Sequence, residues 1–238
     1  NKQYSQMKTR PPLAVLLLAA ALAAPGAAAA DRPSHAKPTV VPLRAQPFPL
    51  QEVRLLDGPF RAAMERDAKY LLELEPDRLL HTIRLNAGLP SSAKPLGHWE
   101  DPKGELRGHF VGHYLSACAL MHASTGDPRF QERAALMARE LARCQAALGA
   151  SGYLSAFPES FIDRVETTGR VWAPYYTLHK ILAGLLDIHA HCGNAQALEV
   201  ARRLGDWVAA RNERLSDDQL QKMLDVEHGG INEAMANL

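Results

Sequence analysis

Apolar residues recur along most of the chain at the three- and four-residue spacing of α-helices, and the alternation typical of strands is nearly absent. The pattern predicts helices at about 58–75, 76–85, 107–124, 128–148, 174–192, 195–213 and 216–224, with another starting near 230. In 128–148 the apolar residues form one stripe, whereas those of 174–192 cover most of the circumference. The chain is therefore expected to be all-α, with some helices half-exposed and others buried on nearly all sides.

These two kinds of helix follow one another twice, in segments that align with each other. Residues 125–142 (TGDPRFQERAALMARELA) align with residues 192–209 (CGNAQALEVARRLGDWVA), at a separation of about 67 residues. In each copy an apolar inner helix ends at a glycine, and Asp127 or Asn194 then begins an amphipathic outer helix. Two-helix units of this kind stack as a solenoid or close into an α/α toroid.

The length of the repeat sets an expectation for the ring. Six units at this period need about 400 residues, whereas residues 31–238 provide about half of that number. The last segment, HGGINEAMANL, reads as the opening of a third inner helix with no residue to end it. We therefore expect roughly the first half of an (α/α)6 barrel, truncated on its C-terminal side.

Composition and charge limit the partners. The chain has 238 residues, of which 47% are hydrophobic and 22% charged, with a formal net charge of +1, as in ordinary globular proteins. Lys and Arg are scattered among nearly as many Asp and Glu, so no basic stripe is available for nucleic acid. The expected partner is neutral or mildly polar.

The N-terminal residues predict export. A short basic segment at residues 7–10 precedes an apolar run at 13–24 and the small residues 28–30, which is typical of a secretory signal peptide. The apolar run, about 12 residues long, is shorter than the roughly 20 that a membrane-spanning helix needs, and no later segment supplies a span. We expect upstream residues and a signal peptide in 1–30, a Pro-rich extended lead in 31–49, a helical domain in 50–238, and a periplasmic or secreted protein.

The chain has three cysteines, an odd number for an exported protein. Cys118 and Cys144 lie in apolar helical runs, and none of the three, Cys192 included, has the spacing of a zinc site. We expect them to be buried small hydrophobic residues, although their separations allow one disulfide.

Six segments, taken in order, resemble the N-terminal half of the catalytic domain of the β-L-arabinofuranosidase family, glycoside hydrolase family 127 and relatives such as family 146. The segments are LLDGPFRAAMERDAKYLLELEPDRLL, GHWE, RGHFVGHYLSACALMHASTGD, GYLSAFPE, VWAPYYTLHKILAGLLDIH and HGGINEAMANL. The resemblance covers residues 50–238 and implies an (α/α)6 toroid followed by β-sandwich domains. It also implies a retaining exo-glycosidase that removes arabinofuranose from plant glycans.

The same resemblance implies a zinc-bound cysteine as nucleophile and a glutamate as acid/base. It places those residues and the zinc ligands beyond Leu238, so we assign no catalytic or metal-binding residue in this chain. We expect residues 31–238 alone to be inactive.

Polar and aromatic residues concentrate where the inner helices begin, and we predict a sugar pocket there. The imidazoles of His109 and His113, at i and i+4, share one helix face and can donate to or accept from hydroxyls, while Trp99 offers a flat apolar surface. The predicted substrate-binding residues are Trp99, Glu100, His109, His113, Tyr175, His179 and His228. In the loop 151–160, Tyr153 and Glu159 are further candidates, unless this loop is a surface turn with Tyr153 tucked beneath it.

Alternatives exist for the histidine pair and for the whole chain. His109 and His113 could form a structural pair bonded to loop backbone, or a metal site, for which HxxxH without a third ligand is weak support. The chain could instead be a non-catalytic carbohydrate-binding or scaffold protein on the same helical toroid. It could also be a different toroid enzyme, such as a lyase or hydrolase acting on uronate sugars, although the near-zero net charge does not favour an acidic sugar.

Overall fold

The computed structural model describes residue 45 and residues 47–228 and 230–238, so the predicted signal peptide and most of the Pro-rich lead lie outside the described residues. The described part of the chain is helical and contains no strand, which confirms the all-α prediction. Its elements are η1 (Leu50–Glu52), α1 (Pro59–Glu73), α2 (Pro76–Leu79), α3 (His81–Asn86), η2 (His98–Glu100), α4 (His109–Thr125), α5 (Pro128–Ala147), α6 (Ser160–Glu166), α7 (Pro174–Cys192), α8 (Ala195–Asn212), α9 (Asp217–Met223) and α10 (Ile231–Asn237).

The predicted helices are all present, with two differences. The stretch expected as one helix at 76–85 is two short helices, α2 and α3, which meet at Leu80. The structure adds α6, which the pattern did not predict. This helix has seven residues and no side-chain cap, and it is held by the burial of Ile162 and Val165 rather than by local signals.

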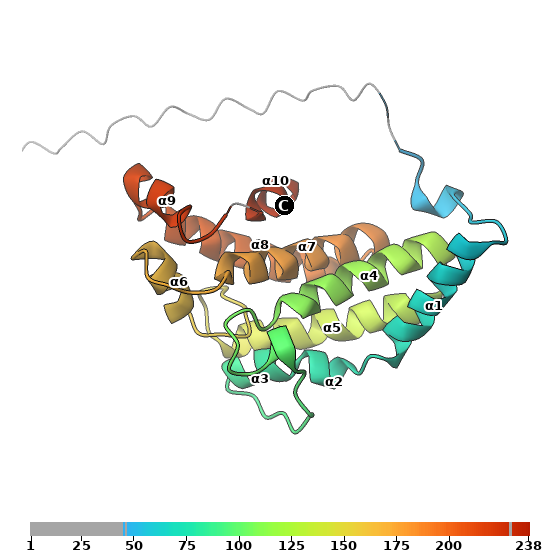
Figure 1. Cartoon of the computed structure of the whole chain (residues 1–238), viewed down its shortest axis with the longest axis horizontal. Coiled ribbons are helices and arrows are strands. Elements are labelled where there is room, and N and C mark those ends of the chain that lie inside the picture. Colours follow the sequence, from blue (N-terminus) through green and yellow to red (C-terminus); the bar gives the residue numbers. More distant parts are fainter. Residues whose placement is uncertain (1–44, 46, 229) are drawn as a thin grey trace, which may run out of the picture. The chain divides into compact units, whose positions relative to one another are not determined.

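The two-helix repeat is confirmed in α4–α5 and α7–α8. The inner helices α4 and α7 end at Gly126 and Gly193, whose φ angles of 74° and 67° lie in the left-handed region. The outer helices α5 and α8 then begin behind Asp127 and Asn194, whose side chains accept backbone N–H groups of the first turn. Figure 1 shows these four helices alongside one another, with α4 packed on α7, each inner helix on its outer helix, and α5 on α8.

The inner helices cross with their backbones almost in contact. A Cβ atom on Gly112 would lie 2.0 Å from the carbonyl carbon of Lys180, and one on Gly184 would lie 2.5 Å from the carbonyl oxygen of Gly112. The contacts advance in the same direction along both helices, because His109 lies beside Tyr176 while Gly112 lies beside Lys180 and Gly184. The two inner helices are therefore side by side and parallel.

Burial follows the two kinds of helix that the sequence predicts. The buried residues of α7 include the consecutive Thr177, Leu178 and His179, which point to different sides of the helix, whereas α5 buries a single stripe that includes Phe130 and Met137. Paired inner and outer helices are the unit from which α/α toroids are built. Closure into a ring stays a prediction.

Candidate functional site

Five aromatic or imidazole rings from η2 and from the N-terminal ends of α4 and α7 lie close together. The ring centroids of His109 and His113 are 5.8 Å apart, and the Tyr176 ring lies 5.9 Å from the first and 6.3 Å from the second. The Trp99 ring is 6.3 Å from His109, and the His179 ring is 6.3 Å from Tyr176. We call Trp99, His109, His113, Tyr176 and His179 the ring cluster.

The geometry of the ring cluster follows from the parallel packing of the inner helices. Since α4 and α7 run in the same direction, their N-termini lie at the same end, and the crossing at Gly112 and Gly184 brings the two helices within reach of each other. His113 Nε2 lies 3.2 Å from the hydroxyl oxygen of Tyr176, a hydrogen bond between the two helices.

Glu100, in η2, has both carboxylate oxygens turned toward the start of α4. Its Oε2 accepts the backbone N–H of Gly108 at 2.7 Å, and its Oε1 accepts that of Phe110 at 2.8 Å. The same Oε1 lies 2.7 Å from Nδ1 of His109. The carboxylate therefore caps α4 and holds His109, which differs from the direct contact with a sugar hydroxyl that the sequence suggested for it.

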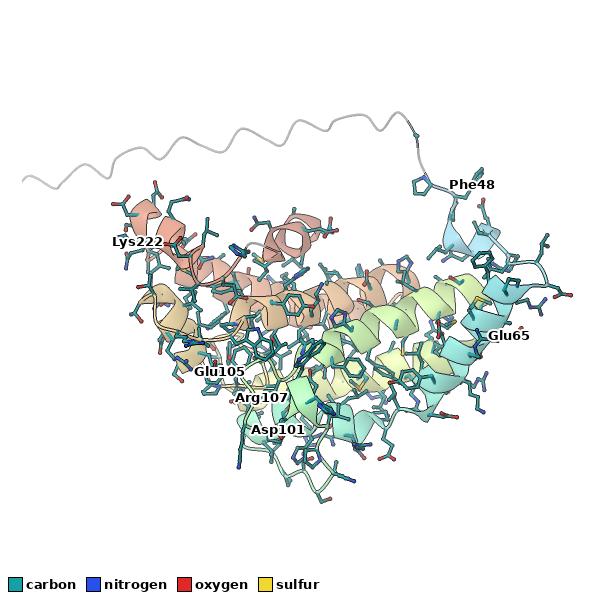
Figure 2. All side chains as sticks on the ribbon, in the orientation of Figure 1. Phe48, Glu65, Asp101, Glu105, Arg107 and Lys222 are labelled. Carbon is teal, nitrogen blue, oxygen red and sulfur yellow. The ribbon has the colours of Figure 1, made fainter. Side chains whose placement is uncertain are left out.

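The segment that leads into α4 is tied to the start of α7. Glu105, labelled in Figure 2, accepts the backbone N–H of Trp172 at 2.9 Å and pairs with Arg164 of α6 at 2.7 Å. Burial raises the pKa of Glu105, but the hydrogen bonds from Arg164 and Trp172 outweigh this effect and lower the pKa below its usual range. Arg107, also labelled in Figure 2, donates to the carbonyl oxygen of Ala156 at 2.8 Å.

The three histidines of the ring cluster differ in their electrostatics. Burial favours the neutral form of His109, but the hydrogen bond and charge of Glu100 outweigh burial and raise its pKa above the ordinary value. Burial, followed by the positive charge of Lys180, lowers the pKa of His113 and of His179. The cluster thus holds one imidazole biased toward the charged form and two biased toward the neutral form.

Of the three histidines, His179 is the one that contacts the later part of the chain. Its Nδ1 is buried, and no described residue hydrogen-bonds it. Gly230 packs directly against this ring, since a Cβ atom there would lie 2.9 Å from His179 Nδ1. Gly230, just before α10, therefore covers one side of the ring cluster.

Two of the predicted site residues, Tyr175 and His228, lie in a separate cavity of about 220 Å³ between α7, α8, α9 and α10. Tyr175 points away from the ring cluster and donates its hydroxyl to Asn212 Oδ1 at 3.0 Å, and burial raises its pKa to about 12. The exposed His228 lines the same cavity. The structure thus brings together Trp99, Glu100, His109, His113 and His179, but not Tyr175 or His228.

Sequence reasoning missed two residues of this region, Tyr176 and Glu227. Tyr175 and Tyr176 are four and three residues before His179, so helical spacing alone could not select which of them shares its face. Glu227 accepts the backbone N–H groups of Tyr175 at 3.0 Å and Tyr176 at 2.6 Å, and so caps α7 from a distant segment. Burial raises its pKa to about 7.

The loop 151–160 follows the structural alternative for Tyr153. This side chain is buried, donates its hydroxyl to the carbonyl oxygen of Phe157 at 2.6 Å, and packs against Trp207. Glu159 pairs with the buried Arg211 at 3.2 Å. Both residues therefore have structural partners in the loop and in α8.

The described residues do not form a zinc site. In the described ranges no three side chains of His, Cys, Asp or Glu are arranged to hold a metal ion. All three cysteines are free thiols, and burial raises the pKa of Cys118 and of Cys144 to about 11. Both therefore stay protonated and unreactive in the core, as the sequence predicted for buried small residues.

Pairs of inner and outer helices, with a group of imidazole, phenol and indole rings at one end of the inner pair, define a helical domain with a candidate ligand site at that end. The family model described as beta-L-arabinofuranosidase, GH127 catalytic domain, matches residues 52–238, and the chain belongs to this family. The resemblance seen in the sequence is confirmed. No curated protein matched the chain. Among the described residues, no helix has the length and apolar character needed to span a membrane.

Proposed function

We propose that this chain is part of a retaining, exo-acting β-L-arabinofuranosidase that removes arabinofuranose from plant glycans. The observation that carries the proposal is the family match over residues 52–238, which makes the protein a glycoside hydrolase with a glycan as substrate. The predicted signal peptide supports a periplasmic or secreted location, where such glycans are met.

The ring cluster supplies the groups that a furanose ring needs. The neutral imidazoles of His113 and His179 and the hydroxyl of Tyr176 can each donate to or accept from sugar hydroxyls. Trp99 is 64% exposed and lies beside His109, where its flat face can cover the C–H groups of a sugar. In this proposal the cluster binds and orients arabinofuranose.

Hydrolysis of a glycosidic bond also needs a nucleophile and an acid/base. The two buried glutamates nearest the inner-helix N-termini, Glu100 and Glu227, use their oxygens to cap α4 and α7. Cys118 and Cys144 are buried thiols with raised pKa values. None of these four residues is therefore assigned either role in this proposal, which keeps the nucleophile, the acid/base and the zinc beyond Leu238, where the resemblance implies them.

The proposal is tested by following the imidazole NMR signals of the chain during titration with methyl β-L-arabinofuranoside and, separately, methyl β-D-glucuronide. We expect the arabinofuranoside to shift signals of the ring cluster and the glucuronide to leave them unchanged. Shifts with the glucuronide alone would favour a uronate-processing enzyme, and no shift with either sugar would contradict the assignment of the cluster to substrate binding.

A second experiment tests catalysis. We expect no hydrolysis of 4-nitrophenyl β-L-arabinofuranoside by the 238-residue chain, even where binding is observed. Turnover by this chain would place the catalytic pair among its own carboxylates, with Glu100, Glu159, Glu227 and Glu233 as the residues to replace.

A further inference from the structure

We propose that Glu100 is a positioning residue, which ties the N-terminus of α4 to the Nδ1–H of His109 so that His109 presents Nε2 to a sugar hydroxyl. The sugar in this statement rests on the proposed function, whereas the arrangement of Glu100 and His109 does not.

The Glu100 carboxylate is surrounded by hydrogen-bond donors. Its carboxylate is buried and receives the backbone N–H groups of Gly108 and Phe110 at 2.7 and 2.8 Å, with Nδ1 of His109 at 2.7 Å. An ionised carboxylate is an acceptor only, and here it meets two backbone donors that cannot change their role. The carboxylate therefore lies at the positive end of the α4 dipole and faces hydrogen-bond donors from the start of that helix.

The contacts of Nδ1 determine which ring nitrogen of His109 carries the proton. Besides Glu100 Oε1, its Nδ1 lies 2.9 Å from the carbonyl oxygen of Leu106, which can only accept. With acceptors on both sides, Nδ1 must carry the proton, because the alternative tautomer would place its lone pair against two other lone pairs. The hydrogen-bond network thus selects one tautomer of His109.

The other ring nitrogen of His109, Nε2, faces the ring cluster. No described residue hydrogen-bonds Nε2 of His109, and the rings of Trp99, His113 and Tyr176 surround the imidazole. With Nδ1 occupied, Nε2 is the nitrogen left for a ligand, as an acceptor in the neutral ring and as a donor in the protonated ring. The orientation of this group is set by Glu100 rather than by the ligand.

The charge on His109 depends on the groups that face it. These are Glu100 from η2, His113 from α4, and Tyr176 and Lys180 from α7, while Arg107 faces Glu100 itself. Glu100 favours the imidazolium and Lys180 opposes it. Removing the Glu100 charge should therefore lower the pKa of His109, because only the hydrogen bond to the Leu106 carbonyl oxygen then opposes burial and Lys180.

Glu227 offers a matched control within the same chain. It too is a buried carboxylate that accepts two backbone N–H groups at the start of an inner helix, those of Tyr175 and Tyr176. Unlike Glu100, it has no hydrogen bond to a histidine ring in the described structure. A comparison of the two glutamates therefore separates capping from the positioning of His109.

The experiment measures the titration and tautomer of His109 by NMR of ring-labelled histidine in the full chain, in wild type, Glu100→Gln, Glu100→Asp and Glu227→Gln. We expect the Nδ1–H tautomer in wild type, and in Glu100→Gln a lower titration midpoint and a mixture of tautomers. Glu100→Asp should restore part of the midpoint, since it keeps the charge, and Glu227→Gln should leave His109 unchanged. Both Gln variants should lower Tm, since each weakens a helix cap.

Three outcomes would overturn the positioning role. These are a wild-type His109 found mainly as the Nε2–H tautomer, a Glu100→Gln variant whose His109 titrates as in wild type, and equal effects of Glu100→Gln and Glu227→Gln on His109. The first is measured in wild type, so it remains decisive even if Glu100→Gln does not fold.

The contact between His109 Nε2 and a sugar hydroxyl is tested separately, by titration with methyl β-L-arabinofuranoside. We expect affinity about fivefold weaker in Glu100→Gln than in wild type, the loss of about one hydrogen bond. If the tautomer depends on Glu100 but the sugar shifts no signal in wild type, the proposed function fails while the positioning of His109 stands. If the sugar binds wild type and Glu100→Gln equally well, His109 does not present Nε2 to it.

Discussion

The two ends of the inner helices α4 and α7 are built in opposite ways. At the C-terminal ends the same residues recur at the same places, with a glycine in the left-handed region, an Asp or Asn cap on the next helix, and a histidine whose Nδ1 meets the backbone oxygen of that cap. At the N-terminal ends only the types of side chain are shared. Their caps come from different parts of the chain, Glu100 from just before α4 and Glu227 from the segment that follows α9.

The two ends of each repeat therefore have different roles. The C-terminal ends only have to turn the chain from an inner to an outer helix, which local residues do equally well in each copy. The N-terminal ends meet each other in the ring cluster, so each copy contributes different groups to one shared site. Substitutions at the two ends should therefore have different consequences.

The largest effect is expected where the two helices cross. Gly112→Ala would place a methyl group 2.0 Å from a backbone carbonyl carbon of α7, and the backbones would have to separate. We expect a loss of about 3 kcal/mol or more in the free energy of unfolding, measured by urea denaturation, together with a disturbed ring cluster. Gly97→Ala is the control, because a Cβ atom there meets nothing within 4 Å, and an equal loss in both variants would contradict this account.

The cap on α7 is expected to make stability depend on pH. The pKa of Glu227 is about 7 in the folded chain against a usual value of 4.5, so the folded state holds a proton that the unfolded state releases between these two values. Stability from this group is fully present below pH 4.5 and is lost as the pH rises through 7. The difference between these two pKa values corresponds to about 3 kcal/mol, of the same order as the effect at the crossing.

Urea denaturation between pH 4.5 and 7 measures this effect. We expect the free energy of unfolding of wild type to decline relative to that of Glu227→Gln across this range, by an amount of that order. Parallel curves for the two proteins would show that Glu227 titrates alike in the folded and unfolded chains.

The two ends of α7 can be compared directly through their histidines. His179→Ala, at the N-terminal end, should weaken binding of methyl β-L-arabinofuranoside about tenfold, or about 1.4 kcal/mol, because it removes a ring of the cluster. His189→Ala, at the C-terminal end, removes only a contact to the Asn194 carbonyl oxygen, so it should leave the affinity unchanged. Calorimetric titration measures both affinities. Equal affinities of His179→Ala and wild type would show that His179 has a structural role and does not bind the sugar.

The smallest effects are expected at the C-terminal ends, where they should be equal. Asp127→Ala and Asn194→Ala each remove an N-cap that accepts one backbone N–H, which is worth about 1 kcal/mol. Thermal unfolding should show similar losses in Tm for the two variants and no change in sugar binding. A marked difference between them would contradict the equivalence of the two repeats.

The contrast also explains how much could be predicted from the sequence. Most features that depend on local spacing were predictable, from the bounds of the long helices to the caps at Gly126, Asp127, Gly193 and Asn194, although the break at Leu80 was not. The helix α6 was missed, because a seven-residue segment is stabilised mainly by contacts with distant residues such as Arg211.

The candidate site was predictable in place but not in detail. The concentration of His and aromatic residues at the inner-helix N-termini located the ring cluster. The choice of Tyr176 over Tyr175 depends on the rotation of α7 about its axis, which is set by its packing on α4 and α8. The roles of Glu100 and Glu227 depend on loops folding back onto helix ends, for which short-range patterns carry no signal.

The crossing at Gly112 and Gly184 has a consequence for the evolution of such a domain. Because backbone atoms rather than side chains set the distance between the helices, the apolar residues elsewhere on α4 and α7 can exchange for others of similar volume without moving the ring cluster. Lineages that keep these two glycines can therefore accumulate neutral changes in the core while the spacing of His113 and Tyr176 is inherited intact.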